Sequence, residues 1–240
     1  MASARGIVTR VYNGFNKRLA RVLVPLIARP QSRGRRFDTL GSGDGKWRVP
    51  VDEIPKGAIA YCVGVGVDAT FDVALASNYG AAVHSFDPTP RSIDYMNDLL
   101  RDYPDIIFHP IGIWNKETTL RFYAPMTASS PNYSARDIHG TDRYFEAKCK
   151  TVKQVMNELG HRKVDILKID IEGAWPEVVN SIIDDDINAA LLCVEFDSPT
   201  STYKALKHIK RLAHAGYALI DRDRDNYIFA YIGANAKPEV

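Results

Sequence analysis

The sequence is poor in the features that mark several protein classes. It has three cysteines in 240 residues, without CxxC or Cys/His spacing, which argues against a disulfide framework and a zinc site. We expect Cys62, Cys149 and Cys193, which lie in apolar or strand-like segments, to be reduced core residues of a cytoplasmic protein. The longest apolar run near the start, Val22 to Ala28, is too short to cross a bilayer, and no convincing signal-peptide cleavage site accompanies it.

Acidic residues are missing from residues 1–36, which hold nine Lys and Arg, whereas the rest of the chain has 22 basic and 29 acidic residues. Apolar residues recur there at helical spacing, so we expect a basic amphipathic helical extension that kinks or ends at Pro25. It packs on the main domain or on a second subunit, or lies as a peripheral helix on anionic lipid. Nucleic-acid binding is not expected, because no recognised motif accompanies the charge.

Residues 37–57 are rich in Gly and Pro and are predicted to be an irregular connector with one short strand around Trp47–Val51. Over 58–240 apolar runs alternate with helical patterns, which predicts an α/β domain with a mostly parallel sheet. Strands are expected at 58–65, 81–87, 106–113, 165–171 and 189–196, helices at 69–80, 90–103, 152–160, 175–184 and 202–216, an inserted antiparallel pair at 119–124 and 144–152, and a terminal hairpin at 217–223 and 226–233.

Ligands of parallel sheets bind beyond the carboxyl ends of the strands. After the first predicted strand, Gly64 and Gly66 allow a tight turn and close approach to a ligand. After the second comes Asp87, an acid about 20 residues past the glycine turn, which is well placed to accept both ribose hydroxyls. Together these residues predict a cofactor that contains adenosine.

Two such cofactors compete. "GVGVDA" satisfies GxGxxG/A, and Tyr144 and Lys148 match the YxxxK of short-chain dehydrogenases, which would favour an NAD(P) oxidoreductase. However, YxxxK belongs on a helix and here lies in a strand-like segment, so we interpret it as a coincidence. The terminal hairpin and the charged end of the 165–171 strand favour S-adenosylmethionine instead.

The residues also carry a family resemblance. "CVGVGVDATFDVALASNYGAAVHSFDPTP", "YFEAKCKTVKQVMNELG", "VDILKIDIEGAWPEVV" and "LLCVEFD" resemble FkbM-type S-adenosylmethionine-dependent methyltransferases, from about Ala58 to Gly233. "LKIDIEG" is the most specific of these pieces and "FDPTP" the next. The resemblance implies a Rossmann-like class I methyltransferase fold, a mostly parallel seven-stranded sheet with a C-terminal antiparallel hairpin, and O-methylation of a sugar, glycan or polyketide-like product.

The resemblance also assigns site residues. The methyl-transfer site would have Asp170 and Glu172, and the cofactor site would consist of Gly64, Val65, Gly66, Asp68, Asp87, Pro88, Gly112, Ile113 and Asp170, with residues 111–113 along the adenine. The sequence departs from the family at Tyr61, where many class I enzymes have an acid near the donor's amino group. It departs again at Trp175, where the family usually has an acid.

The charged strand end suggests several mechanisms. Asp170 is expected to act as base or to orient the acceptor hydroxyl. Asp170, Glu172 and Glu195 are hard oxygen ligands, so Mg²⁺ is an alternative. Lys168 either pairs with Asp170 or Glu195 and holds them in place, or acts directly in catalysis, which would need a lowered pKa.

Other candidates are interpreted as structural or peripheral. His84 and His109 are expected to be strand or edge histidines, although His109 could border the adenine pocket. Residues 129–140, in the polar loop 125–143, form either a lid or acceptor-binding loop or a simple surface excursion. The remaining alternative to an enzyme is a non-catalytic membrane- or partner-binding module with the same fold.

Overall fold

Strands and helices alternate along the chain from Ile59 onward, as the apolar pattern predicts. The computed structural model describes residues 22–24, 27–124, 133–135, 141–197 and 200–233. Its helices are α2 (Thr70–Tyr79), α3 (Pro90–Leu99), α4 (Val152–Leu159), α5 (Trp175–Asp184) and α6 (Thr202–His214), with a 3₁₀ turn, η1, at Val51–Glu53. Two helix termini are as the sequence predicts: α4 begins with a capping box at Thr151, and α2 ends at the left-handed Gly80.

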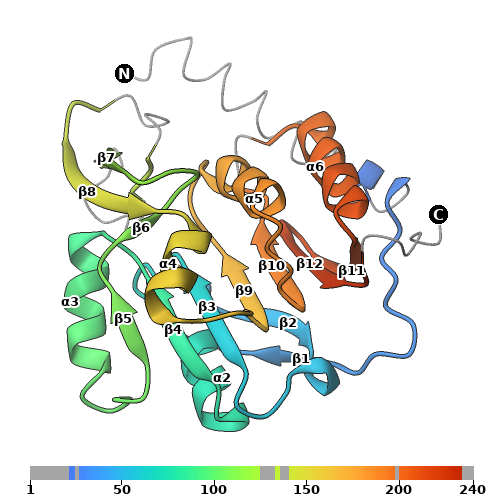
Figure 1. Cartoon of the computed structure of the whole chain (residues 1–240), viewed down its shortest axis with the longest axis horizontal. Coiled ribbons are helices and arrows are strands. Elements are labelled where there is room, and N and C mark those ends of the chain that lie inside the picture. The colour runs from blue at the N-terminus through green and yellow to red at the C-terminus, as the bar shows by residue number, and fades with distance from the viewer. Residues whose placement is uncertain (1–21, 25–26, 125–132, 136–140, 198–199, 234–240) are drawn as a thin grey trace.

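The central sheet has seven strands in the order β11-β12-β10-β9-β3-β4-β5 (Figure 1). Its strands are β3 (Ile59–Val63), β4 (Ala82–Phe86), β5 (Ile107–His109), β9 (Ile166–Ile169), β10 (Leu191–Glu195), β11 (Tyr217–Asp223) and β12 (Asn226–Tyr231). The ladders from β5 across to β10 are parallel, whereas β12 is antiparallel to both of its neighbours. The expected mostly parallel seven-stranded sheet with its C-terminal antiparallel hairpin is confirmed.

Alternate residues of the strands enter two separate cores. Tyr61 and Leu167 pack with α4, α5 and α6, which cover one face of the sheet in Figure 1. Cys62 and Ile166 pack on the other face, with Phe71 of α2 and Trp47. The three cysteines are free and buried, as the sequence predicts. Since both faces are covered, the strands read as continuous apolar runs rather than as alternating ones.

The segment predicted as an irregular connector is more ordered than expected. It forms an antiparallel hairpin of β1 (Phe37–Leu40) and β2 (Trp47–Pro50), of which the sequence indicated only the second strand. Trp47 is 1% exposed and its ring lies 6.5 Å from that of Phe71. The loop 41–46 is thereby held against the domain rather than left as a free linker.

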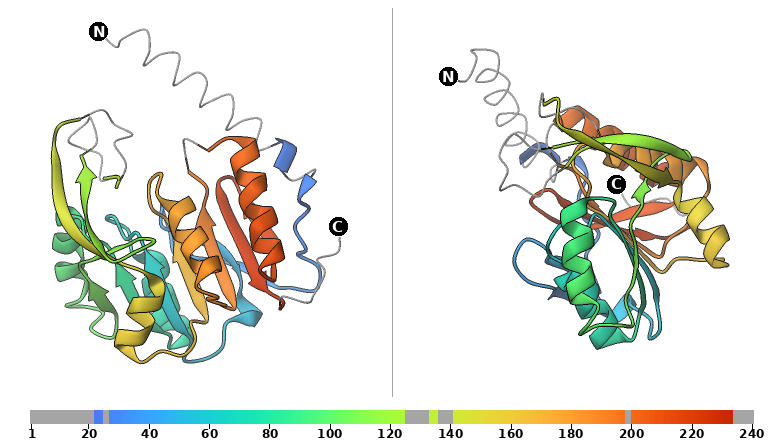
Figure 2. Two further views of the ribbon diagram at one scale, coloured as in Figure 1. Left: turned by 45° about the horizontal axis from the view of Figure 1, so that its top comes forward. Right: turned by 90° about the vertical axis from the view of Figure 1, so that its left-hand side faces the viewer.

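The strand predicted over 106–113 is in fact two strands in different sheets. Pro110 lacks the N–H that would continue the ladder, so β5 stops at His109. The chain then turns, with the Ile111 N–H donating to the His109 carbonyl at 2.8 Å. The following strand, β6 (Gly112–Ile113), pairs instead with β8 (Tyr144–Lys150), next to β7 (Thr118–Tyr123). This second sheet extends beyond the β5 edge of the central sheet, near α3 (Figures 1 and 2).

The predicted N-terminal helix lies mostly outside the described residues. Of the described part, Val24 is fully buried in the core beside α5 and α6, and the Gln31 N–H donates to the Leu219 carbonyl at 2.8 Å. The end of the extension therefore packs on the domain. Nowhere in the described part of the chain is a helix both long and apolar enough to cross a membrane.

Candidate functional site

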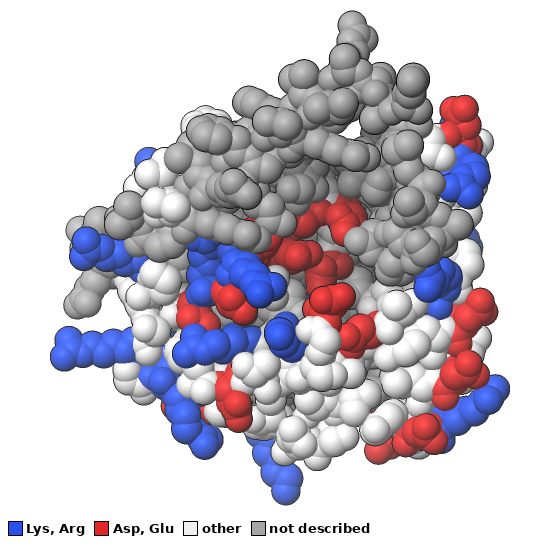
Figure 3. All heavy atoms as spheres, turned by 180° about the vertical axis from the view of Figure 1, so that it is seen from behind, with Lys and Arg blue, Asp and Glu red and all other residues white. Residues whose placement is uncertain are grey.

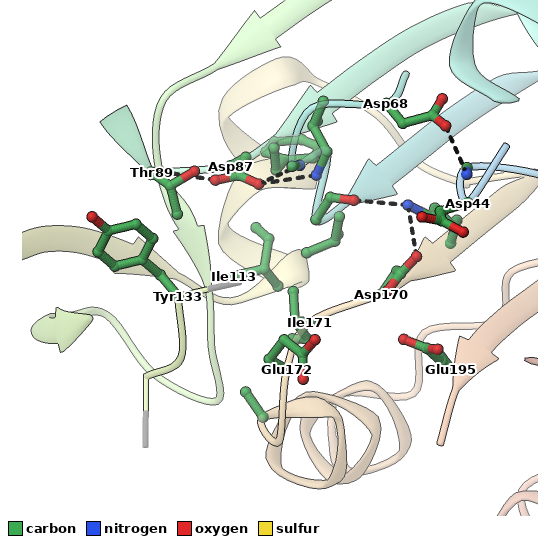
Figure 4. A pocket seen from close by; sticks show the side chains of 18 of the residues that line it. Asp44, Asp68, Asp87, Thr89, Ile113, Tyr133, Asp170, Ile171, Glu172 and Glu195 are labelled. Carbon is green, nitrogen blue, oxygen red and sulfur yellow. Dashed lines mark hydrogen bonds and ion pairs between the residues drawn. The ribbon is translucent and has the colours of Figure 1, made fainter. Parts of the chain in front are cut away.

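A cavity of about 680 Å³ opens at the carboxyl ends of β3, β4 and β9. The chain order reverses between β3 and β9, so this is the topological switch point of the sheet. Of the residues that the sequence assigned to a site, Ile111 does not line this cavity. The others do: Gly64, Val65, Gly66, Asp68, Asp87, Pro88, Gly112, Ile113, Lys168, Asp170, Glu172 and Glu195. Figure 4 shows how several of these side chains point into it.

Gly64 is the tightest point of the glycine turn. Its φ is +85°, and a Cβ placed there would lie 1.8 Å from the Asp170 carbonyl oxygen. The Gly64 N–H donates to the Phe86 carbonyl at 2.9 Å, and the Asp170 N–H donates to the Val63 carbonyl at 2.9 Å. Only glycine allows the turn at Gly64 to approach the backbone after β9 this closely, and this contact positions Asp170 relative to the turn.

Asp87 holds the same turn from the side of β4. One carboxylate oxygen accepts the N–H groups of Val65 and Gly66 at 3.0 and 2.9 Å, and the other accepts the Thr89 N–H at 2.8 Å. The side chain is 6% exposed and still lines the cavity. Because each carboxylate oxygen can accept two hydrogen bonds, the Thr89-bonded oxygen keeps capacity for a ligand hydroxyl.

Asp68 was predicted to line the methionine and ribose part, and it also joins two segments. Its carboxylate accepts the N–H of Gly45 at 2.9 Å and the N–H and hydroxyl of Thr70 at 3.1 and 2.7 Å. These bonds hold the pKa of Asp68 below its usual value despite partial burial. The loop of the β1–β2 hairpin is thus fixed to the start of α2.

Lys168 is a buried cation beneath the site. It is 3% exposed, donates to the Gly64 carbonyl at 2.7 Å, and pairs with the Asp170 carboxylate at 3.4 Å. Burial disfavours its charged form, but the negative charges of Asp170 and Asp72 outweigh that effect and raise the pKa of Lys168. A lysine that acts as a general base needs a lowered pKa, so this geometry favours the positioning role.

Four carboxyl groups lie at or just after the ends of two strands, Asp170 and Glu172 after β9, and Glu195 and Asp197 at the end of β10. Burial, with the negative charge of Asp170 and a hydrogen bond to it, raises the pKa of Glu195 to about 10. Burial, with a hydrogen bond to Glu172 and its charge, raises the pKa of Asp197 to about 9. Asp197 also accepts the Gly173 N–H at 2.6 Å, which fixes the turn after β9. Each pair therefore shares a proton at neutral pH instead of holding two negative charges.

These pairs predict an unusual pH dependence of stability. As pH rises above about 4.5, the unfolded chain loses the Glu195 proton while the folded chain keeps it to about pH 10, so the free energy of unfolding should fall. We expect Glu195→Gln to reduce that slope by up to about 1.4 kcal/mol per pH unit between about pH 7 and 9. Urea unfolding between about pH 7 and 9 measures the slope. His84 does not contribute there, because burial lowers its pKa to about 4 and it titrates at lower pH.

The matched control is Asp105→Asn, which neutralises an exposed carboxylate far from the pocket residues. It should leave the slope unchanged. An equal slope in the wild-type protein and in Glu195→Gln would mean that Glu195 is already ionised at neutral pH.

The alternative of a magnesium site at Asp170, Glu172 and Glu195 is not supported. Among the described residues no group of three or more His, Cys, Asp or Glu side chains is placed to hold a metal ion. Asp170 is ion-paired with Lys168, and Glu195 carries a proton because of its raised pKa. A protonated carboxyl and an ion-paired one make a poor oxygen cage for Mg²⁺, so these three acids do not favour a magnesium site.

The structure adds pocket residues that the sequence did not indicate. Residues 43–46 of the β1–β2 loop and 223–226 of the β11–β12 turn both line the cavity, as do Trp114 and Tyr133. The glycine-rich "GSGDGK" was the available signal for the first of these, but it reads equally well as a linker. Of residues 129–140, predicted as a lid or acceptor-binding loop, only 133–135 are described, and the rest lies outside the described residues.

Other candidates lie away from the cavity. His84 and His109 are joined by a ring-nitrogen hydrogen bond of 3.0 Å on β4 and β5 and do not line the pocket. Tyr61 is fully buried and its hydroxyl bonds His161 at 2.8 Å. Trp175 is a core residue, stacked on Phe196 with ring centroids 4.0 Å apart.

The dehydrogenase-like motif is also outside the pocket. Tyr144 and Lys148 belong to β8, which pairs antiparallel with β7, and Tyr144 is 46% exposed. A strand with an exposed tyrosine does not provide the helical spacing that YxxxK requires. This location removes the main support for an NAD(P) oxidoreductase.

Comparisons with known proteins give a consistent result. The family model of the methyltransferase FkbM domain matches residues 59–218. The probable methyltransferase-like protein 24 of Homo sapiens is 30% identical over 127 residues, which are 52% of this chain and 28% of that protein. The protein of the same name from Rattus norvegicus is 29% identical over 127 residues, with the same coverage of 52% and 28%. The match thus spans little more than a quarter of these relatives' length.

Solved structures similar to this chain are distant in sequence. Methyltransferase FkbM from Methylobacillus flagellatus KT is 13% identical with a TM-score of 0.47, over 74% of this chain and 44% of that one. Aeropyrum pernix fibrillarin, in complex with natively bound S-adenosyl-L-methionine, is 13% identical with a TM-score of 0.42, over 85% of each chain.

Proposed function

Because this chain belongs to the FkbM methyltransferase family, whose members depend on S-adenosylmethionine, we propose that it methylates a hydroxyl of a sugar, glycan or related natural product. The observation that carries the proposal is the Asp170 carboxylate, which faces the cavity beside the buried Lys168 and the Glu195 carboxyl. Carboxyl groups there are suited to accept hydrogen bonds from hydroxyls.

The pocket residues fit the methyl donor. The flat glycine turn at Gly64 gives a backbone surface that a nucleoside can approach closely. Asp87 offers the ribose a carboxylate fixed by three backbone N–H groups, and Gly112 and Ile113 give the adenine an apolar edge. A cavity of about 680 Å³ is within the range of about 300–1,000 Å³ typical of small-molecule sites.

The chain's own contribution to the reaction lies mainly in positioning and proton removal. S-adenosylmethionine supplies, when bound, a methyl group on a positively charged sulfur. Asp170 would accept the hydrogen bond of the acceptor hydroxyl, align its oxygen, and take its proton as the new C–O bond forms and the bond between the methyl carbon and the donor's sulfur breaks. Lys168 positions Asp170, and the Glu195 carboxyl stabilises the Asp170 charge by its hydrogen bond.

Acidic groups also dominate the acceptor side of the pocket. Glu172 and the turn residues Asp223 and Asp225 line it, together with the uncharged carboxyl of Glu195 and one basic side chain of the turn, Arg224. Figure 3 shows acidic side chains gathered at the centre of the face seen from behind, with basic side chains to one side. Such a surface repels phosphates and carboxylates, so we propose an uncharged polyhydroxyl acceptor.

The test is methyl transfer from isotopically labelled donor to a panel of methyl glycosides, with neutral and uronic-acid members of the same sugars. We expect label in base-stable methyl ethers of the neutral sugars, identified by mass spectrometry. Label in base-labile esters of the uronic acids, or only in amines of an added amino-sugar set, would overturn the assignment of a hydroxyl acceptor.

A further inference from the structure

The loop of residues 43–46 is built as a wall of the pocket. Gly45 donates its N–H to Asp68 at 2.9 Å, and a Cβ at this position would lie 2.5 Å from the same carboxylate. Ser42 adds a second contact, since its N–H donates to the Thr70 hydroxyl at 2.8 Å. The loop is therefore anchored on the glycine turn and on the start of α2.

Two opposite charges flank the anchored glycine. Asp44 and Lys46 both line the pocket, and neither forms a hydrogen bond or ion pair with any of the residues that the structure describes. Gly45, which lies between Asp44 and Lys46, is fixed by its hydrogen bond to Asp68. The loop thus presents one negative and one positive group to whatever occupies this end of the cavity.

The proposed donor also points toward this end. Figure 4 shows Asp87, Thr89 and Ile113 toward one side of the pocket, and Asp44 and Asp170 toward the other. With the ribose at Asp87 and the adenine at Ile113, the amino-acid end of the donor would lie toward Asp44. That end carries an ammonium group and a carboxylate, which is the same pair of charges with opposite signs.

The first strand offers no other partner for the ammonium group. β3 reads Ile-Ala-Tyr-Cys-Val and contains no acid, and the Tyr61 hydroxyl is engaged by His161 away from the pocket. Asp68 already accepts three hydrogen bonds, from Gly45 and Thr70, which leaves it at most one for a ligand. An acid from outside the strand is therefore needed at this position, and Asp44 supplies one.

We infer that the 43–46 loop binds the amino-acid end of the methyl donor, with Asp44 holding the ammonium group and Lys46 the carboxylate. The inference rests on the proposed donor site. It assigns a ligand-binding role to a hairpin that lies before residue 59, where the family match begins.

Three ligands distinguish the contribution of the ammonium group from that of the carboxylate. S-adenosylhomocysteine has both groups, decarboxylated S-adenosylmethionine keeps the amine alone, and 5′-methylthioadenosine has neither. Calorimetry with Asp44→Asn should show about 5- to 10-fold weaker binding of the first two and unchanged binding of the third. Lys46→Met should weaken S-adenosylhomocysteine by a similar factor and leave the other two unchanged.

The controls neutralise exposed charges outside the pocket, Asp38→Asn on the same hairpin and Lys56→Gln just after it. Neither should change any affinity. Equal losses for all three ligands, or no loss in Asp44→Asn and Lys46→Met, would overturn the inference while leaving the donor site intact. Failure of the wild-type protein to bind any of the three would instead remove the proposed function itself.

Discussion

Asp170→Asn is expected to lower the rate of methyl transfer by about 10²- to 10⁴-fold, the range that a general base contributes. The amide has nearly the same shape and still accepts a hydrogen bond, but it cannot take the acceptor's proton. Lys168 would keep its bond to the Gly64 carbonyl, so the glycine turn should stay in place. Initial rates with labelled donor, at saturating donor concentration, measure the effect.

Donor affinity distinguishes lost chemistry from lost structure. We expect Asp170→Asn to bind S-adenosylhomocysteine within about threefold of the wild-type protein, because the pocket wall is unchanged. Asp105→Asn, an exposed substitution of the same kind, should keep full activity. Full activity in Asp170→Asn would remove this residue from the mechanism, and lost donor binding would make it a binding residue only.

Gly64→Ala should have the largest effect on stability. The new methyl group would lie 1.8 Å from the Asp170 carbonyl, and the backbone would keep an unfavourable φ of +85°. Since the obstacle is backbone directly after the inner strand β9, it cannot rotate away, and either the turn or the end of β9 must shift. We expect a loss of roughly 4 kcal/mol or more in the free energy of unfolding, measured in urea.

Gly66→Ala is the matched control, two residues further along the same turn. Its φ of +59° is also left-handed, but nothing lies within 4 Å of a Cβ placed there. It should therefore lose only about 1–2 kcal/mol, the penalty of the left-handed backbone. Equal stability of the two variants would mean that the close approach of the glycine turn to β9 is not maintained in solution.

Much of the fold follows from local patterns in the sequence. Continuous apolar runs such as that at Ile59–Val63 require cover on both faces, and helical spacing with Thr151 and Gly160 as end signals fixes α4 almost to the residue. Strand ends in a parallel sheet share one edge, so the residues after each strand had to meet. For that reason the predicted site residues converge on one cavity.

What the sequence did not reveal depends on pairing between distant segments. The β1–β2 hairpin reads as a linker, because its stability comes from Trp47 packing on Phe71 and from Asp68 binding Gly45. Asp197 follows β10 as one more surface-like acid until its contacts with Glu172 and Gly173 are known. Such contacts between distant segments produce no periodic pattern in the sequence.

The acidic pairs show why the sequence suggests a metal site that the described residues do not support. Three acids at neighbouring strand ends are what a cation site requires. The sequence cannot show that Lys168 already compensates Asp170, or that burial leaves Glu195 protonated with its pKa raised to about 10. Charge state depends on burial, and burial is a property of the folded chain.

The central claim is that the cavity at the ends of β3, β4 and β9 binds the methyl donor. Calorimetric titration of the purified protein with S-adenosylhomocysteine tests it most directly. One site per chain with a micromolar dissociation constant is predicted, with no heat from NAD(P) under the same conditions. Absence of binding, or binding of NAD(P) in its place, would contradict the account.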